Sequence, residues 1–140
     1  MKRRWIWSII GVFAFTFSGC DIESEENFNF ITLEIVDVEL PETFDFNATY
    51  DIKVYYRRPD DCHFFQGFDV FTADESTRNI VAIGRELSGE TCTTTNDEIE
   101  ATFTFRVLFS NTYTLRFFSG EDQNGDPIYL EYQVPVVLGN

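Results

Sequence analysis

The sequence is poor in the residues on which most catalytic and metal sites depend. It contains one histidine, His63, and three cysteines among 140 residues. A Ser-His-Asp triad would have to be built around His63, and no nucleophile-elbow motif accompanies it. His63 directly follows Cys62, and neighbours in an extended strand point to opposite faces, so the two are not expected to form a dyad. Two thiols and one histidine also fall short of a closed zinc site.

Basic residues are scarce as well. The chain has 10 Lys and Arg against 24 Asp and Glu, and three of the basic residues stand at positions 2–4. Without the first 19 residues, 7 basic and 24 acidic side chains give a net charge of −17. Such a surface repels nucleic acid and anionic headgroups. No spacing singles out one carboxylate pair. We therefore expect no enzyme, no cofactor and no nucleic-acid partner, with a carboxylate-pair hydrolase as the remaining catalytic alternative.

The chain also lacks an apolar run of the roughly 20 residues that a comfortable membrane span needs. Its longest apolar segment, Trp5–Phe17, follows the positive Lys2–Arg4 and ends in Phe17-Ser18-Gly19-Cys20. This order is typical of a secretory signal. Small residues directly before a cysteine resemble the lipobox of bacterial lipoproteins, with Phe17 in place of the common leucine. The resemblance implies that Cys20 receives diacylglycerol, that cleavage follows Gly19, and that the new amino terminus can be acylated.

Residues 20–29 are expected to form a lipidated, acidic tether. Asp21–Asn27 carries acidic side chains that cannot bury themselves. This run resembles the surface-export signal of Bacteroidota lipoproteins, although Asp21 also resembles an inner-membrane retention signal of enteric bacteria. The Phe-rich, acidic composition favours the first interpretation. We expect a membrane-anchored envelope protein, in the outer membrane and facing the surface or the periplasm. Two alternatives remain: a cleaved signal in which Cys20 is incidental, and a retained transmembrane anchor.

The remaining cysteines, Cys62 and Cys92, are expected to form a disulfide, because an exported domain matures in an oxidising compartment. A Cys62–Cys92 bond would close a loop of about 30 residues, which stabilises a fold by about 3–4 kcal/mol on the chain-entropy model. Residues 1–19 are then the signal peptide and residues 30–140 a single domain. Within that domain we find no internal repeat and no long linker.

Alternation of apolar and polar residues dominates this domain. Arg58–Asp61, Ser88–Asp97 and Gly120–Pro127 carry turn or loop residues, and Asn124-Gly125 is a strong hairpin signal. Pro135 indicates a sheet edge. The patterns predict about seven strands, over residues 30–38, 48–57, 62–73, 79–86, 99–109, 112–119 and 128–136.

Seven strands with turns at this spacing predict an all-β, antiparallel sandwich. Ser110–Leu115 also resembles the start of strand F in immunoglobulin-like domains, where a tyrosine stands two residues before a core position. Leu115 occupies the place at which antibody domains carry a cysteine. The resemblance therefore implies a broad Ig-like or fibronectin-III-like fold rather than an antibody domain.

Two groups of residues are candidates for binding. Alternation places Tyr55, Phe118 and Tyr129 on outward faces, where they would form an aromatic platform, lie scattered or pack against a loop. Asp122, Asn124 and Asp126 have the every-second-residue spacing of a cation loop. However, Pro127 replaces the required Gly, Gln133 replaces the bidentate Glu, and the same residues suit a hairpin turn. Asp60 and Asp61 are a similar, weaker cation candidate.

The leading functional hypothesis is a non-catalytic binding module held at the cell envelope. Its expected partners are an envelope protein or an extracellular glycan, contacted through the loops 57–61, 87–97 and 120–127. The alternative is a structural accessory subunit that pairs one sheet edge with a larger partner. The sequence gives no indication of the oligomeric state.

Overall fold

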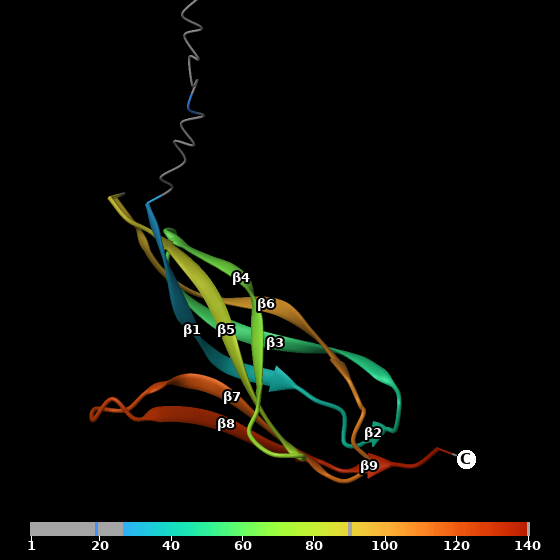
Figure 1. The fold of residues 1–140 in the computed structure, drawn as a ribbon. Helices are drawn as coiled ribbons and strands as arrows, with labels where there is room; N and C mark the ends of the chain where they lie inside the picture. The colour runs from blue at the N-terminus through green and yellow to red at the C-terminus, as the bar shows by residue number, and fades with distance from the viewer. Residues whose placement is uncertain (1–18, 20–26, 90, 140) are drawn as a thin grey trace, which may run out of the picture.

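The computed structural model describes residues 19, 27–89 and 91–139, and the described chain is all-β (Figure 1). None of these residues forms a helix able to cross a bilayer. The strands are β1 (Phe28–Glu39), β2 (Phe44–Asp45), β3 (Thr49–Asp60), β4 (His63–Thr72), β5 (Thr77–Leu87), β6 (Thr94–Arg106), β7 (Tyr113–Glu121), β8 (Pro127–Val134) and β9 (Val136–Val137).

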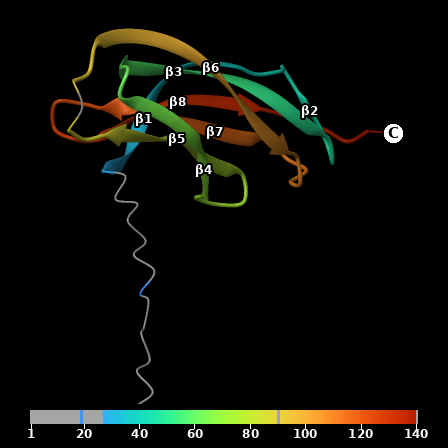
Figure 2. The same cartoon turned by 90° about the horizontal axis from the view of Figure 1, so that it is seen from above.

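The seven long strands form one curled sheet, in which successive pairings connect β6-β3-β1-β5-β7-β8. β1 and β7 pair with successive parts of one edge of β5, and β4 pairs with its other edge. The curl depends on β1. Residues 28–33 of β1 pair with β5, residues 34–39 pair with β3, and the second pairing has a register shift between Ile35 and Asp37. A bulge of this kind bends a strand and increases its twist. As a result, β3 and β6 lie on one side of the fold, and β4, β5 and β7 on the other (Figure 2).

The expectation of a wholly antiparallel arrangement is wrong at two pairings. β5 and β7 run parallel, as do the short strands β2 and β9. The parallel pairing of β5 with β7 follows from the path of the chain. Between these two strands in the sequence, β6 runs back along the opposite side of the fold, so β7 has the same direction as β5. Parallel neighbours need a crossover connection of this kind.

Each of the seven predicted strands has a counterpart, but several boundaries differ. β1 begins at Phe28, inside the segment 20–29 that was expected to be a tether, and β6 ends at Arg106 rather than at Phe109. β6 begins at Thr94, inside the segment 88–97 that we expected to be a polar loop. β3 continues through Pro59, although a turn was expected at Arg58–Asp61. The pairing of β3 with β6 shifts register between Arg58 and Asp60. This irregularity accommodates proline, which cannot donate to the ladder.

The inward positions form one aromatic-rich core. Phe103 on β6 contacts Phe68 on β4 and Phe117 on β7, so the rings connect the two sides of the fold. Tyr113 is buried, and its hydroxyl accepts hydrogen bonds from the backbone N–H groups of Leu108 at 3.1 Å and Phe109 at 2.8 Å. The hydroxyl therefore satisfies two donors beyond the end of β6, which fixes the turn into β7.

Candidate functional site

β1 begins at the end of the domain where β5 ends and β6 starts (Figure 1). The disulfide lies at this end, because the backbone N–H of Leu87, the last residue of β5, donates a hydrogen bond to the Cys62 carbonyl at 3.0 Å. Cys62, in the turn between β3 and β4, is bonded to Cys92, which precedes β6. Their Cα atoms are 5.6 Å apart, within the ordinary range for a disulfide. The predicted pairing is thus confirmed. We call this end of the molecule, which holds residues 57–63, 87–89 and 91–94 and the start of β1, the disulfide end.

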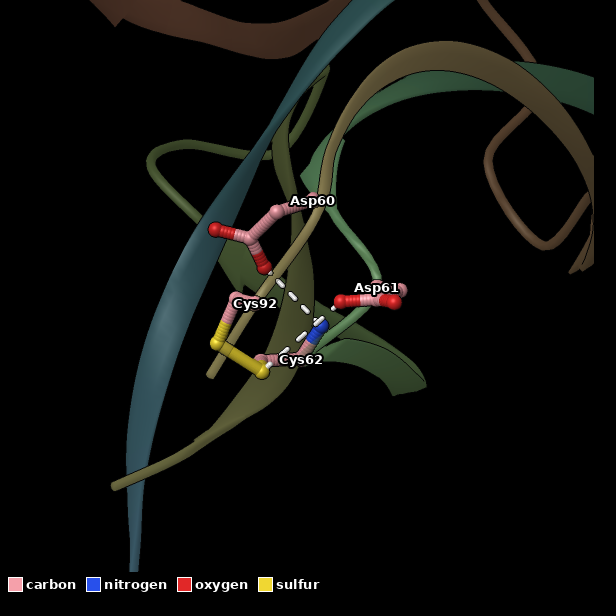
Figure 3. A group of neighbouring side chains, drawn as sticks. All are labelled: Asp60, Asp61, Cys62 and Cys92. Carbon is pink, nitrogen blue, oxygen red and sulfur yellow. Dashed lines mark hydrogen bonds between the residues drawn. A yellow bond between two sulfur atoms is a disulfide. The ribbon is translucent and has the colours of Figure 1, made fainter. Parts of the chain in front are cut away.

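Two aspartates build the turn around the disulfide (Figure 3). Asp60 Oδ1 accepts a hydrogen bond from the Cys62 backbone N–H at 2.9 Å, and Asp61 Oδ1 accepts one from the Thr93 N–H at 2.8 Å. Their carboxylates lie close to both sulfur atoms, within 4.8 Å of one another. However, sulfurs joined in a disulfide are not the thiolates that bind metals. The geometry is that of a turn that holds two loops together.

His63 lies beside this turn, with its side chain only 12% exposed. Its Nδ1 atom is 2.5 Å from Asp60 Oδ1, and its Nε2 atom is 3.9 Å from Glu86 Oε1. The hydrogen bond from His63 is the largest cause that holds the pKa of Asp60 below its usual value. Because Cys62 is in the disulfide, it is not available as a nucleophile for His63.

A cleft of about 200 Å³ opens next to His63. Its walls are residues 31–34 of β1, Arg57 and Pro59 of β3, and His63 itself. It lies where β1 passes from β5 to β3, so the change of partner leaves a gap between strands. Apolar walls with both charge signs suit a small polar ligand. Among the described residues no Asp or Glu is buried, and a general acid usually needs such burial.

The structure brings together two of the three candidate aromatic residues. Phe118 on β7 and Tyr129 on β8 meet edge to face, with ring centroids 6.1 Å apart, and the Arg116 guanidinium lies 4.1 Å from the Tyr129 ring. Tyr55 lies on β3, and β1 and β5 stand between β3 and β7 in the order of the sheet.

Tyr55 makes polar contacts with the two strands that flank β3. Its hydroxyl lies 3.0 Å from Glu39 Oε1 and 3.2 Å from Glu100 Oε2, and its one proton is shared between these two acceptors. These hydrogen bonds, with that to Glu39 as the largest cause, raise the pKa of Tyr55 to about 12. Tyr55 therefore joins β1 to β6 across β3 rather than extending the pair on β7 and β8.

The candidate cation loop forms the hairpin between β7 and β8. Asp122 Oδ1 accepts hydrogen bonds from the backbone N–H groups of Asn124 at 2.8 Å and Asp126 at 3.0 Å. Gly125 adopts φ of 80°, a conformation that favours glycine. The Asp122 carboxylate thus serves the turn itself. Of the three candidate contact loops, 57–61 and 87–97 meet at the disulfide end, whereas 120–127 is this separate hairpin.

Sequence reasoning missed a group of exposed and half-buried rings on the outer face of β1, β5 and β4. Phe28 and Phe30 stand on β1 and Phe64 on β4, with Arg85 of β5 between them. Phe30 was assigned to the alternating apolar residues of its strand, yet it is 69% exposed. A signal was present. Ile31 begins the inward series of β1, so Phe28 and Phe30 have the opposite parity.

Cys20 and residues 20–26 of the expected tether lie outside the described residues, as do residues 1–18 of the expected signal. The chain matches no protein family model, and no curated protein or solved structure is detectably similar to it.

Proposed function

We propose that this protein is an exported lipoprotein, anchored through acyl chains on Cys20, whose domain is a non-catalytic interaction module at the bacterial cell envelope. The observation that carries the proposal is the use of the three cysteines. Cys62 and Cys92 bond to each other, which favours an oxidising, exported location. Cys20 is left without a partner cysteine in the chain, at the end of a signal-like segment.

Metabolic labelling tests the anchor. Cells that express the full chain are fed an alkyne-tagged fatty acid, and the protein is then examined for label and membrane fractionation. We expect the wild-type chain to carry the label and Cys20→Ser to lose both the label and membrane association. A matched control, Cys62→Ser with Cys92→Ser, keeps Cys20 and should remain labelled. An unlabelled wild-type chain in a Bacteroidota host would overturn the proposal.

The interaction part of the proposal rests on the surfaces around the disulfide end. The cleft beside His63 is lined by the polar residues Glu34 and Arg57 together with apolar ones, and the Arg57 guanidinium lies 3.9 Å from Glu98 Oε1. Such a surface can bind the polar groups of a protein or a glycan and exclude water from part of the contact. In-cell crosslinking from position 57 tests this step, with position 106 on the exposed face of β6 as the control.

The direction in which the domain faces is a separate part of the proposal. We infer surface export from the acidic run Asp21–Asn27. Protease added to intact cells should digest a surface-exposed domain without lysis. Protection until the envelope is opened would place the domain in the periplasm and favour envelope-assembly partners.

For the fold, we propose a variant of the Ig-like or fibronectin-III-like sandwich. The hydroxyl of Tyr113, which bonds back to Leu108 and Phe109, supports this kinship because it resembles the tyrosine corner of such domains. An experimental structure with the two halves of β1 in two facing sheets would agree with it. A single closed barrel would contradict it.

A structural accessory subunit is the second candidate function. The specific observation is β8, which pairs with β7 alone among the described strands. An open edge can accept a strand from a partner. If this function is correct, deleting the chain should dissociate a copurified complex.

A further inference from the structure

We propose that the outer face of β1, β5 and β4 at the disulfide end rests on the surface of the bilayer. This face, which we call the aromatic face, consists of Phe28, Phe30, Phe64, Ile83, Arg85 and Leu87. The inference rests on the proposed lipid anchor and names what lies against the domain once the anchor is inserted. The occupant is the zwitterionic headgroup region of the membrane.

The strand register defines the aromatic face. Phe30 on β1 and Phe64 on β4 both stand opposite Arg85, one on each side of it. Phe28 stands opposite Leu87, and its ring meets that of Phe30 edge to face at 5.2 Å. Neighbouring positions of the same parity lie on the same side of a sheet, so these side chains form one outward surface.

The exposure of these rings and their contacts with Arg85 suit a boundary between water and an apolar phase better than bulk water. Phe30 is 69% and Phe64 37% exposed. The Arg85 guanidinium lies 5.8 Å from the Phe28 ring and 5.7 Å from the Phe64 ring. Aromatic rings with a cation among them suit the membrane–water interface, where an apolar body and a charged end are both accommodated.

The length of the tether places the bilayer beside this face. Eight residue steps separate Cys20 from Phe28, which span at most about 28 Å when fully extended. β1 itself, with 12 residues, is about 36 Å long at strand spacing. The distance between an anchored Cys20 and the start of β1 is therefore always shorter than β1 itself. Because β1 begins at Phe28, the aromatic face is the part of the sheet nearest the membrane.

Charge selects the kind of lipid. The two rows of the face nearest the start of β1, Phe28 with Leu87 and Phe30 with Arg85 and Phe64, contain no carboxylate. The mature chain as a whole carries a net charge of −17 and is repelled by anionic headgroups. Contact with zwitterionic lipid avoids that repulsion while it removes the exposed rings from water.

A single-tryptophan experiment tests the contact in the lipidated, full-length mature protein. Both tryptophans, Trp5 and Trp7, lie in the expected signal segment, so a substituted Trp is the sole reporter after cleavage. We choose Phe30→Trp and, as matched control, Phe71→Trp. Phe71 is 56% exposed, and it stands on the same outward face as Phe64 because the register of β4 shifts between Phe65 and Gly67. It lies seven residues beyond Phe64, about 23 Å away.

Each variant is reconstituted in phosphatidylcholine vesicles whose acyl chains are brominated close to the headgroup. We expect the emission of Phe30→Trp to be quenched several-fold more than that of Phe71→Trp. The inference is overturned if neither variant is quenched, or if both are quenched equally. It is also overturned if a photocrosslinker at position 30 captures a protein rather than lipid in native cells.

Mass spectrometry of the Cys20 peptide separates this inference from the proposed function. An unlipidated Cys20 in protein from the native host would refute the anchor itself. A lipidated Cys20 with an unquenched Phe30→Trp would refute only the contact of the aromatic face. Circular dichroism and an intact Cys62–Cys92 disulfide show that each variant is folded before it is measured.

Discussion

The two ends of the domain are held together in different ways. At the disulfide end, the first buried side chain of β1 is Leu33, and β6 has none before Ala101. At the opposite end, near β2 and β9, Phe44 is fully buried and contacts the rings of Tyr50, Phe105 and Tyr113. One end depends on a covalent bond with polar turns, and the other on packed aromatic rings.

The difference shows that the two ends of this small acidic domain are stabilised by different interactions. Where strands extend beyond the core, there is little apolar area to bury, and a disulfide compensates by restricting the unfolded chain. Where the chain reverses near the core, aromatic burial is sufficient. The disulfide end is then free to expose apolar side chains for contact with a neighbour, whereas the packed end is not.

The largest expected effect is at the packed end. Phe44→Ala removes a fully buried ring and leaves a cavity among three aromatic side chains, so we expect a loss of about 3–5 kcal/mol in the free energy of unfolding. Urea denaturation of the oxidised protein measures it. The neighbouring Phe46→Ala, at a ring that is 37% exposed, should reduce stability clearly less than Phe44→Ala. Similar losses for the two variants would contradict the assignment of the core.

Removal of the disulfide should affect the other end. Replacing Cys62 and Cys92 by Ala opens a loop with a sequence separation of 30, and we expect to lose about 3–4 kcal/mol. Hydrogen exchange should also accelerate first at residues 94–98 of β6, whose backbone has few buried neighbours. Acceleration that is uniform along β6 would mean that the disulfide end is not a separate unit.

The buried hydroxyl of Tyr113 gives a smaller and more local test. Tyr113→Phe keeps the ring but leaves the backbone N–H groups of Leu108 and Phe109 without their acceptor, at a cost of about 1–3 kcal/mol. Tyr129→Phe, at a ring that packs against Phe118 on the sheet surface, is the control. If the two substitutions have equal effects on the urea midpoint, the hydroxyl does not fix the turn into β7.

The sequence predicted local periodicity well and the neighbours of each strand poorly. Alternation over Ile99–Val107 and Tyr113–Phe117 identified inward side chains, because a half-buried strand must alternate. The parallel pairing of β5 with β7 was missed, since it depends on which side of the fold β6 occupies. No local pattern encodes that choice.

The same distinction applies to the candidate sites. The Cys62–Cys92 bond was predictable because, with Cys20 assigned to the expected lipobox, the two remaining cysteines leave one pairing. The outward position of Phe30 was harder to predict, since β1 carries apolar residues on both faces where it changes partner. The cleft beside His63 arises at that change of partner, and it was not predictable from any single segment.

The smallest expected effect compares two aspartates at opposite ends of β4. The pKa of Asp60 is held low chiefly by the hydrogen bond from His63, and that of Asp74 by hydrogen bonds from Ser76 and Thr77. A carboxyl whose folded pKa is depressed contributes stability above its unfolded pKa, and this contribution is lost as the pH falls through the folded pKa.

NMR titration of the side-chain carboxyl carbons distinguishes the two causes. His63→Phe removes the donor to Asp60, so the pKa of Asp60 should rise toward its usual value while that of Asp74 stays low. Ser76→Ala should do the reverse, because Ser76 also donates through its hydroxyl. If His63→Phe leaves the pKa of Asp60 unchanged, the backbone N–H of Cys62 holds that carboxylate, and the turn at the disulfide end forms without the histidine.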